Sequence, residues 1–206
     1  MDCVKIGKLI ARLRKEKKLT QKNIADVLGI QSKTVSKWEC GLGCPDLSLW
    51  PELSAILGVD IKQMMEGDIT PNKTDNGNID KIRFYVCTSC GNILVSTGSA
   101  SIFCCGRKLE RVLPSDTHIA PEITVEETDN DYYITFAHPM TKEHYLSFVA
   151  YVKSDRLFLN RLYPEQSPTC RFPITTGGKL YAYCIKHGLV QWDRWWDIGE
   201  CPKRTT

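Results

Sequence analysis

The chain has 206 residues, of which 42% are hydrophobic and 25% charged, with a net charge of +3 at pH 7 and ten cysteines. This composition is that of an ordinary globular protein, and the length allows one or two domains with modest cores. No apolar run approaches the ~18 residues of a membrane span, and the N-terminus lacks the apolar segment of a secretory signal, so we expect a cytoplasmic protein with no membrane contact.

The positive charge is concentrated at the N-terminus. Residues 1–37 hold ten Lys and Arg against three acidic residues, whereas the remainder holds 17 basic and 21 acidic residues. Such asymmetry predicts that the N-terminal part meets a polyanion. The alternative is a solvated helix face, which a run of charges usually is.

Five short helices are predicted over residues 4–66, because apolar residues recur there at helical spacing. The later four cover residues 21–28, 32–39, 47–57 and 61–65. Thr20 and Asp46 are suited to cap the helices that follow them, and Gly29 is suited to end the helix before it. Ile24, Ala25, Leu28 and Val35 are expected in the core.

Two short helices joined by a tight glycine turn define a helix-turn-helix. The run Thr20-Gln21-x3-Ala25-x3-Gly29-x5-Val35-Ser36-x-Trp38-Glu39-x-Gly41 resembles the Cro and phage-repressor family of DNA-binding domains. The resemblance implies a double-stranded DNA operator as partner, with the second helix in the major groove. The residues that it places toward DNA are Gln21, Lys22, Ser32, Lys33, Thr34 and Lys37. Basic residues of the first helix would add charge for the DNA backbone. The alternative is a module that makes only protein contacts.

Residues 67–80 predict a linker, because they are rich in Gly, Pro, Asn, Asp and Thr with almost nothing to bury. The expected domains are therefore the helix-turn-helix at 1–66, a metal module at 81–113 and a β domain at 114–206.

Four cysteines stand in two pairs in the metal module, and a glycine follows each pair. They are Cys87, Cys90, Cys104 and Cys105. Four thiolates at this spacing predict a metal site rather than disulfides. Two Cys-x-x-Cys pairs would suggest rubredoxin or a zinc ribbon, whereas Cys-x-x-Cys followed by Cys-Cys resembles desulforedoxin, whose centre is one iron held by four thiolates. Zinc suits the same ligands, so iron and zinc both stay open.

Short β-rich runs alternate with turns from residue 120 to 196, at 123–127, 132–136, 146–152, 157–162, 170–174 and 179–184. This spacing predicts an immunoglobulin-like β-sandwich whose loops bring distant ligands together at one end. The expected fold class is thus multidomain, with an all-α head, a small tetracysteine module and an all-β sandwich. Trp192, Trp195 and Trp196 are expected on the sandwich or at a dimer interface.

The chain has four histidines, which together with one cysteine form a candidate metal site. The five residues are His118, His138, His144, Cys184 and His187. Imidazole with a soft thiolate suits a transition metal, and five such ligands exceed the four that zinc usually takes, which favours iron. The alternative is four unrelated histidines with ordinary hydrogen bonds.

The order of these ligands resembles the superoxide reductase domain of the desulfoferrodoxin family, and with the tetracysteine module the resemblance spans residues 82–192. It implies one mononuclear iron with the four histidines as equatorial ligands, Cys184 as axial thiolate and one open position. The implied reaction is one-electron reduction of superoxide to hydrogen peroxide, with an electron donor such as rubredoxin. The amides of Ile185 and Lys186 are candidates to donate to the sulfur.

One departure from the family lies just before His118. Many members have Glu-Lys there, and that lysine is thought to attract superoxide, whereas this chain has Asp116-Thr117. Asp116 is a candidate replacement for the carboxylate. Lys142 or Lys186 could replace the lysine, and a weaker on-rate is expected because steering acts chiefly on association.

Two functions compete. The first is a superoxide reductase-like enzyme with a DNA-binding head, and the second is a redox- or iron-sensing transcriptional regulator whose metal domain does not turn over. A homodimer is expected, because helix-turn-helix heads and desulforedoxin modules both commonly pair. Cys40 and Cys44 are expected to be incidental, with a redox disulfide or a third metal site as alternatives, and no partner is assigned to Cys3, Cys170 and Cys201.

Overall fold

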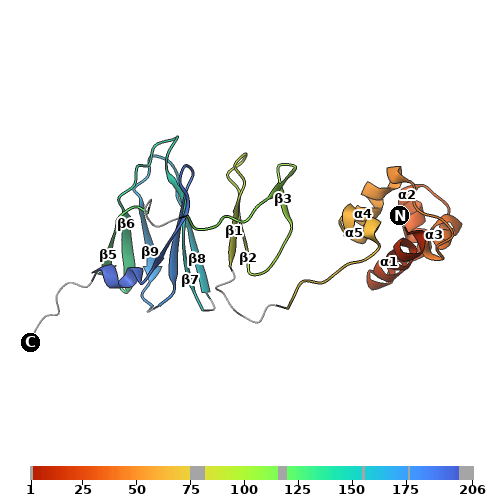
Figure 1. Ribbon diagram of the computed structural model, residues 1–206, viewed down its shortest axis with the longest axis horizontal. Coiled ribbons are helices and arrows are strands. Elements are labelled where there is room, and N and C mark those ends of the chain that lie inside the picture. Colours follow the sequence, from red (N-terminus) through yellow and green to blue (C-terminus); the bar gives the residue numbers. More distant parts are fainter. Residues whose placement is uncertain (1, 75–81, 116–119, 155, 176, 200–206) are drawn as a thin grey trace, which may run out of the picture. The chain divides into compact units, whose positions relative to one another are not determined.

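The computed structural model describes residues 2–74, 82–115, 120–154, 156–175 and 177–199. The chain forms two compact units, Met1–Pro71 and Asn72–Thr206. The first is helical, and the second holds the tetracysteine module and a β-sandwich, which confirms the predicted multidomain fold class (Figure 1). In the described part of the chain, no helix has the length and apolar character needed to cross a membrane.

The helical unit, called the head below, has its elements close to the predicted positions. They are α1 (Cys3–Glu16), α2 (Gln21–Leu28), α3 (Ser32–Glu39), the 3-10 turn η1 (Leu47–Leu49), α4 (Trp50–Leu57) and α5 (Ile61–Glu66). The predicted helix over 47–57 is divided into η1 and α4, with a proline in the first turn of α4. The Thr20 side chain accepts from the Asn23 amide and Asn23 reciprocates, which caps α2 as expected.

Close packing of α1 on α3 organises the head. A Cβ added to Gly7 would lie 1.8 Å from the carbonyl oxygen of Trp38, so only glycine permits this approach. All four predicted core residues, Ile24, Ala25, Leu28 and Val35, are buried in the core of the head.

Two antiparallel sheets form the sandwich (Figure 1). One sheet has the order β5-β6-β9, with bounds Ile123–Thr128, Asp131–Phe136 and Thr169–Pro173. The other has the order β11-β10-β7-β8, with bounds Gly188–Asp193, Lys179–Cys184, Leu146–Lys153 and Arg156–Arg161. Six of these strands lie within two residues of the predicted runs, whereas β11 was not predicted.

The tetracysteine module consists of two short hairpins. The first pairs β1 (Arg83–Val86) with β2 (Ile93–Ser96), and the second pairs β3 (Ile102–Cys104) with β4 (Arg107–Leu109). None of these four strands was predicted, because each has only three or four residues and the cysteine spacing dominates the local sequence.

The module is attached to the outer face of the four-stranded sheet. Phe84 of β1 packs against Phe148 and Tyr181, with ring centroids 5.3 Å apart in each pair. Arg161 of β8 donates through Nη1 to the carbonyl of Gly91 at 2.8 Å, which adds a polar tie. Because β7 is covered on both faces, seven of its eight residues are buried.

Trp195, which follows β11, completes the core of the sandwich. It opens a short 3-10 helix, η4 (Trp195–Gly199), and its side chain is 0% exposed. Its ring meets those of Tyr132 and Tyr151 edge-on, at centroid distances of 5.1 and 5.0 Å. The tryptophans were expected either on the sandwich or at a dimer interface, and the structure packs them on the sandwich.

Candidate metal centres and nucleic-acid interface

Three of the predicted histidines and the predicted cysteine converge at one end of the sandwich. Potential ligand atoms of His138, His144, Cys184 and His187 all lie within 4.8 Å of one another. The first two follow β6, in a loop closed by the hydrogen bond from the Thr141 amide to the His144 carbonyl at 2.9 Å. The other two flank the turn between β10 and β11.

The His138 ring is held with one nitrogen free for a metal. Its Nδ1 lies 2.6 Å from the carbonyl oxygen of Pro139, which can only accept, so Nδ1 carries the proton. Its Nε2 is buried and has no hydrogen-bond partner in the described part of the chain. A buried nitrogen lone pair without a partner is costly, and a metal ion would satisfy it.

The remaining donor atoms lie in a chain of close contacts. His144 Nε2 is 3.4 Å from His187 Nδ1, and His187 Nδ1 is 3.6 Å from Cys184 Sγ. Three imidazoles and one thiol at such distances form a donor set for a transition metal with a preference for nitrogen and sulfur. The residues present therefore fit a transition-metal ion such as iron.

Desolvation favours the neutral form of His138 and His144, which is the form that binds metal. Desolvation lowers the pKa of His138 below its ordinary value, and the neighbouring His144 and His187 lower it further against an opposing hydrogen bond to Pro139. Desolvation also lowers the pKa of His144, with added effects from His187 and the charge of Lys186.

Cys184 lies at the base of the site, with only 1% of its surface exposed. The amide of Lys186 donates to its sulfur at 3.4 Å, as predicted. The expectation for Ile185 was wrong, because its amide donates to the Tyr145 carbonyl at 3.2 Å and continues the ladder between β10 and β7.

The two lysines considered as substitutes for the missing family lysine differ in position. Lys142 Nζ lies 3.8 Å from a Glu165 carboxylate oxygen, with both side chains 71% exposed. Lys186 is exposed and close enough to His144 for its charge to act on that ring. His118 and Asp116 lie outside the described residues.

The four predicted cysteines of the module also converge, with their sulfur atoms within 4.8 Å of one another. Hydrogen bonds from the backbone amides of Cys90 and Ser89 lower the pKa of Cys87 to about 6, although desolvation opposes them. Hydrogen bonding with Cys90, Cys87 and Cys104 raises the pKa of Cys105 to about 12. Four sulfurs this close cannot all be thiolates without a cation among them, so the site fits a metal such as iron or zinc.

The expected DNA-contacting residues lie along the start of α2 and on α3. Ser32, Lys33 and Lys37 are exposed on α3, where Thr34 is partly exposed, and Lys22 is exposed on α2. Gln21 instead donates through Nε2 to a Glu39 carboxylate oxygen at 2.8 Å.

Glu39 is the centre of a network that joins three helices. Arg14 of α1 donates to both carboxylate oxygens of Glu39, at 2.6 and 3.0 Å, while Gln21 of α2 donates to one of them. The ion pair is largely buried, with 14% of the Arg14 side chain and 9% of the Glu39 side chain exposed. Sequence reasoning missed this network, because its members lie 18 and 25 residues apart.

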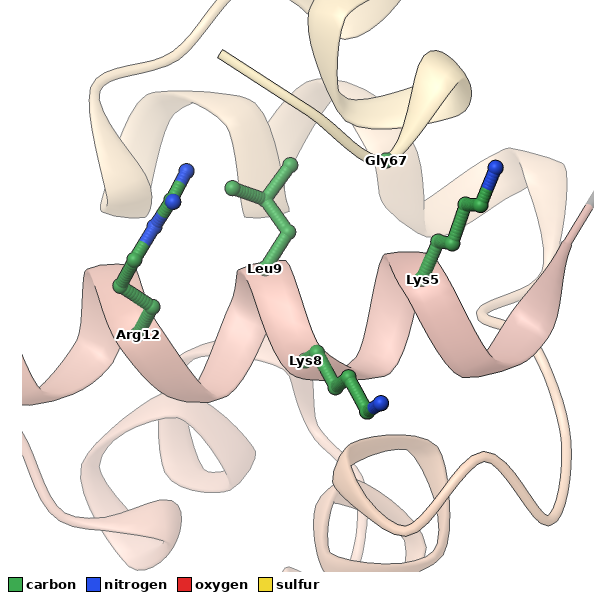
Figure 2. A pocket seen from close by; sticks show the side chains of 5 residues that line it. All are labelled: Lys5, Lys8, Leu9, Arg12 and Gly67. Carbon is green, nitrogen blue, oxygen red and sulfur yellow. The ribbon is translucent and has the colours of Figure 1, made fainter.

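Part of the basic charge of α1 lies away from α3. Lys5, Lys8 and Arg12 line a pocket of about 210 Å³ together with Leu9 and Gly67. Figure 2 shows Lys5, Leu9 and Arg12 on the side of α1 that faces Gly67, with Lys8 turned away. That side is roughly half a turn from Gly7, which meets α3, so Lys5 and Arg12 are poorly placed to contact DNA held by α3.

Two cysteines without a predicted role are joined. Cys3 and Cys44 form a disulfide, which sequence reasoning missed because they are 41 residues apart. Cys40 is free and exposed, and Cys170 is free and buried, with a pKa raised to about 12 by desolvation. Cys201 lies outside the described residues.

Comparisons with known proteins match both parts of the chain. Residues 10–63 match a family model described as helix-turn-helix. A desulfoferrodoxin of Clostridium acetobutylicum is 30% identical over 120 residues, which are 54% of this chain and 96% of that protein. The HTH-type transcriptional activator BcrR of Enterococcus faecalis is 34% identical over 80 residues, which are 37% of this chain and 39% of that protein.

Among solved structures, the superoxide reductase from Treponema pallidum is similar to this chain at 21% identity. The match covers 54% of this chain and 97% of that one, with a TM-score of 0.47.

Proposed function

The chain belongs to the desulfoferrodoxin family, and on this premise we propose that it is a superoxide reductase-like non-haem iron protein with a DNA-binding head. In this proposal His138, His144, His187 and Cys184 hold iron together with His118, and Cys87, Cys90, Cys104 and Cys105 hold a second iron or a zinc ion. The alternative function is that of a redox- or iron-sensing transcriptional regulator.

One observation carries the proposal, which is the buried and unpartnered Nε2 of His138 beside the nitrogens of His144 and His187 and the sulfur of Cys184. Structural histidines usually satisfy both ring nitrogens, whereas a metal-binding histidine donates through one and leaves the other for the ion. The Pro139 carbonyl fixes which nitrogen that is.

Iron bound at these ligands would supply one electron to superoxide, which takes up two protons to become hydrogen peroxide. The chain shapes access to this site, because Cys184 is buried whereas His187 is exposed. A small anion from solvent therefore approaches on the histidine side, away from the sulfur. The amide of Lys186 moderates the charge on that sulfur, while its side chain adds positive charge near His144.

The enzyme reading is tested by reacting the reduced, iron-loaded protein with pulse-generated superoxide. We expect rapid decay of superoxide with one peroxide formed per superoxide, whereas dismutation would give half that yield. The variant His138→Ala is expected to lose iron and this reactivity. If the reduced wild type reacts no faster than the metal-free protein, the enzyme reading fails.

The sensor hypothesis requires an open recognition surface on α3, where Ser32, Lys33 and Lys37 are exposed. A duplex selected from a random-sequence pool would serve as the probe. A sensor should bind it with affinities that differ at least about fivefold between reduced, oxidised and metal-free protein. Equal affinities in the three states would contradict the sensor hypothesis.

We also propose that the protein is a homodimer and that it receives electrons from a donor such as rubredoxin. A dimeric head would read two half-sites about 34 Å apart. Light scattering of the full-length protein tests the first proposal, and anaerobic reduction of the oxidised protein by reduced rubredoxin tests the second.

A further inference from the structure

The disulfide Cys3–Cys44 lies in the head, and the proposed iron chemistry makes no use of it. Cys3 is the first residue of α1, and Cys44 lies in the segment between α3 and η1, with 5.1 Å between the two Cα atoms. The bond therefore ties the start of α1 to the segment through which the chain leaves α3.

The rest of the chain needs reduced cysteines. Seven further cysteines in the described part of the chain are free, and five of them are candidate metal ligands. Metals bind cysteine as thiolate, and disulfides are rare in compartments that keep thiols reduced. This chain combines cysteines that must stay reduced to bind metal with one disulfide-bonded pair. That pair must therefore be oxidised selectively.

We propose that Cys3 and Cys44 are a redox-reversible pair that hydrogen peroxide closes and small thiols reopen. Both residues are half-buried, so small oxidants and thiols can reach them. Cys3 stands at the N-terminus of a helix of 14 residues, where the helix dipole favours the thiolate. Cys44 is then the thiol that completes the bond.

The chemistry balances with peroxide as the sole oxidant. The Cys3 thiolate attacks one peroxide oxygen and breaks the O–O bond, which leaves a sulfenic acid and, after protonation, one water. The Cys44 thiol attacks the sulfenic sulfur and displaces a second water. Two thiols thus lose two electrons, and one peroxide becomes two waters. Only the source of the peroxide rests on the proposed function, because superoxide reduction would produce it.

The disulfide lies where the segment after α3 makes few hydrogen bonds to the rest of the head. Before it, the amides of Gly41 and Leu42 donate to the carbonyls of Trp38 and Lys37, each at 2.9 Å. After it, the Trp50 indole donates to the Pro45 carbonyl at 3.3 Å. Between these ties, a Cβ added to Gly43 would meet nothing within 4 Å. Opening the disulfide therefore leaves the turn after α3 held by the two backbone hydrogen bonds and by the packing of Cys44 on the core of the head.

A third thiol makes the pairing testable. Cys40 is free and exposed at the end of α3, and its neighbour Gly41 packs against Val4, the neighbour of Cys3. Peroxide could therefore join Cys3 to Cys40 instead. The structure predicts that Cys44 is the preferred partner.

The experiment uses the full-length, iron-loaded protein, reduced under anaerobic conditions and then treated with hydrogen peroxide in excess of its iron. Free thiols are alkylated and peptides are mapped without reduction, while amide hydrogen exchange is followed over residues 40–47. We expect a cross-linked Cys3–Cys44 peptide, its reversal by glutathione, and exchange at the hydrogen-bonded amides of Gly41 and Leu42 slowed at least about tenfold by closure. The helical circular dichroism should stay unchanged.

Two variants provide the comparison. Cys40→Ser should keep both closure and the change in exchange, whereas Cys44→Ser should lose both. The inference is overturned if peroxide leaves Cys3 and Cys44 alkylatable, if the bond resists glutathione, or if reduction unfolds the head, since the bond would then be a structural cross-link.

A parallel reaction with superoxide separates this inference from the proposed function. Closure by added peroxide but not by superoxide would count against the superoxide chemistry alone. Failure of peroxide added in excess of the iron would count against the redox pair alone.

Discussion

A few polar side chains decide how the head holds together. Glu39 receives hydrogen bonds from Arg14 and Gln21 while 9% of its side chain is exposed. Burial works to raise its pKa, but these hydrogen bonds and the charges of Arg14 and Lys15 outweigh that effect and lower the pKa. The carboxylate therefore stabilises the folded head in its ionised form.

Replacing this carboxylate should weaken the head. Glu39→Gln removes the charge from a largely buried pair, and we expect the free energy of unfolding to fall by about 2 kcal/mol. Glu16→Gln is the matched control, because Glu16 lies 4.0 Å from Arg12 with more than half of both side chains exposed, and its loss should cost less than about 0.5 kcal/mol. Urea denaturation followed by helical circular dichroism measures both, and equal effects would contradict the network.

The same carboxylate predicts a pH dependence. Its folded pKa is lower than its unfolded pKa, which is about 4.3, so its contribution is present above that value and is lost as the pH falls through the folded pKa. The difference in stability between wild type and Glu39→Gln should therefore shrink between about pH 5 and pH 3. A constant difference over this range would show that the charge contributes nothing.

If superoxide is the substrate, as proposed, Lys186 is better placed than Lys142 to attract it. Its charge acts on His144, whereas Lys142 lies beside Glu165. We expect Lys186→Ala to slow the second-order reaction with superoxide about three- to tenfold and to reduce its dependence on ionic strength, because steering is electrostatic. Lys142→Ala is the control and should change neither quantity. Equal slowing by both variants would assign the effect to overall charge.

At the scale of elements, the short helix η4 closes the sandwich. Trp195 is fully buried between Tyr132 and Tyr151, so Trp195→Ala should lower the free energy of unfolding of the sandwich by about 3–5 kcal/mol. Trp196→Ala should cost less, because Trp196 is only partly buried. Denaturation followed by near-ultraviolet circular dichroism measures both losses. A small effect at Trp195 would mean that η4 is not part of the cooperative core.

For the molecule as a whole, the two compact units should unfold separately. Reducing Cys3–Cys44 removes a cross-link that closes 41 residues, worth about 4 kcal/mol in chain entropy, so the head should melt roughly 25 °C lower. Removing metal with a chelator should lower only the transition of Asn72–Thr206, which holds both candidate centres. Calorimetry of the full-length chain resolves the two effects, and a single shared transition would show that the units are coupled.

Local patterns in the sequence were sufficient for most elements. Helix caps at Thr20 and the apolar period of the head act over a few residues, so the bounds of α2 and α3 were predictable. The strand β11 was not predicted, because its first residue, Gly188, follows the Cys184–His187 ligand pair and was assigned to that metal motif. The four strands of the module were too short to show an alternation of apolar and polar residues. The cysteine and histidine positions predicted both clusters, because metal chemistry restricts ligand type and spacing.

The sequence by itself determined which chemistry each part of the chain could hold, since ligand identity, helix caps and strand periodicity are written in neighbouring residues. Only the tertiary structure decided which ring nitrogen of His138 is free, that Glu39 joins three helices, and that Cys3 pairs with Cys44. Each of these depends on groups that lie far apart in the chain or on a backbone carbonyl whose direction no residue type specifies. Such contacts arise when the core packs, and packing brings together residues that sequence spacing cannot relate.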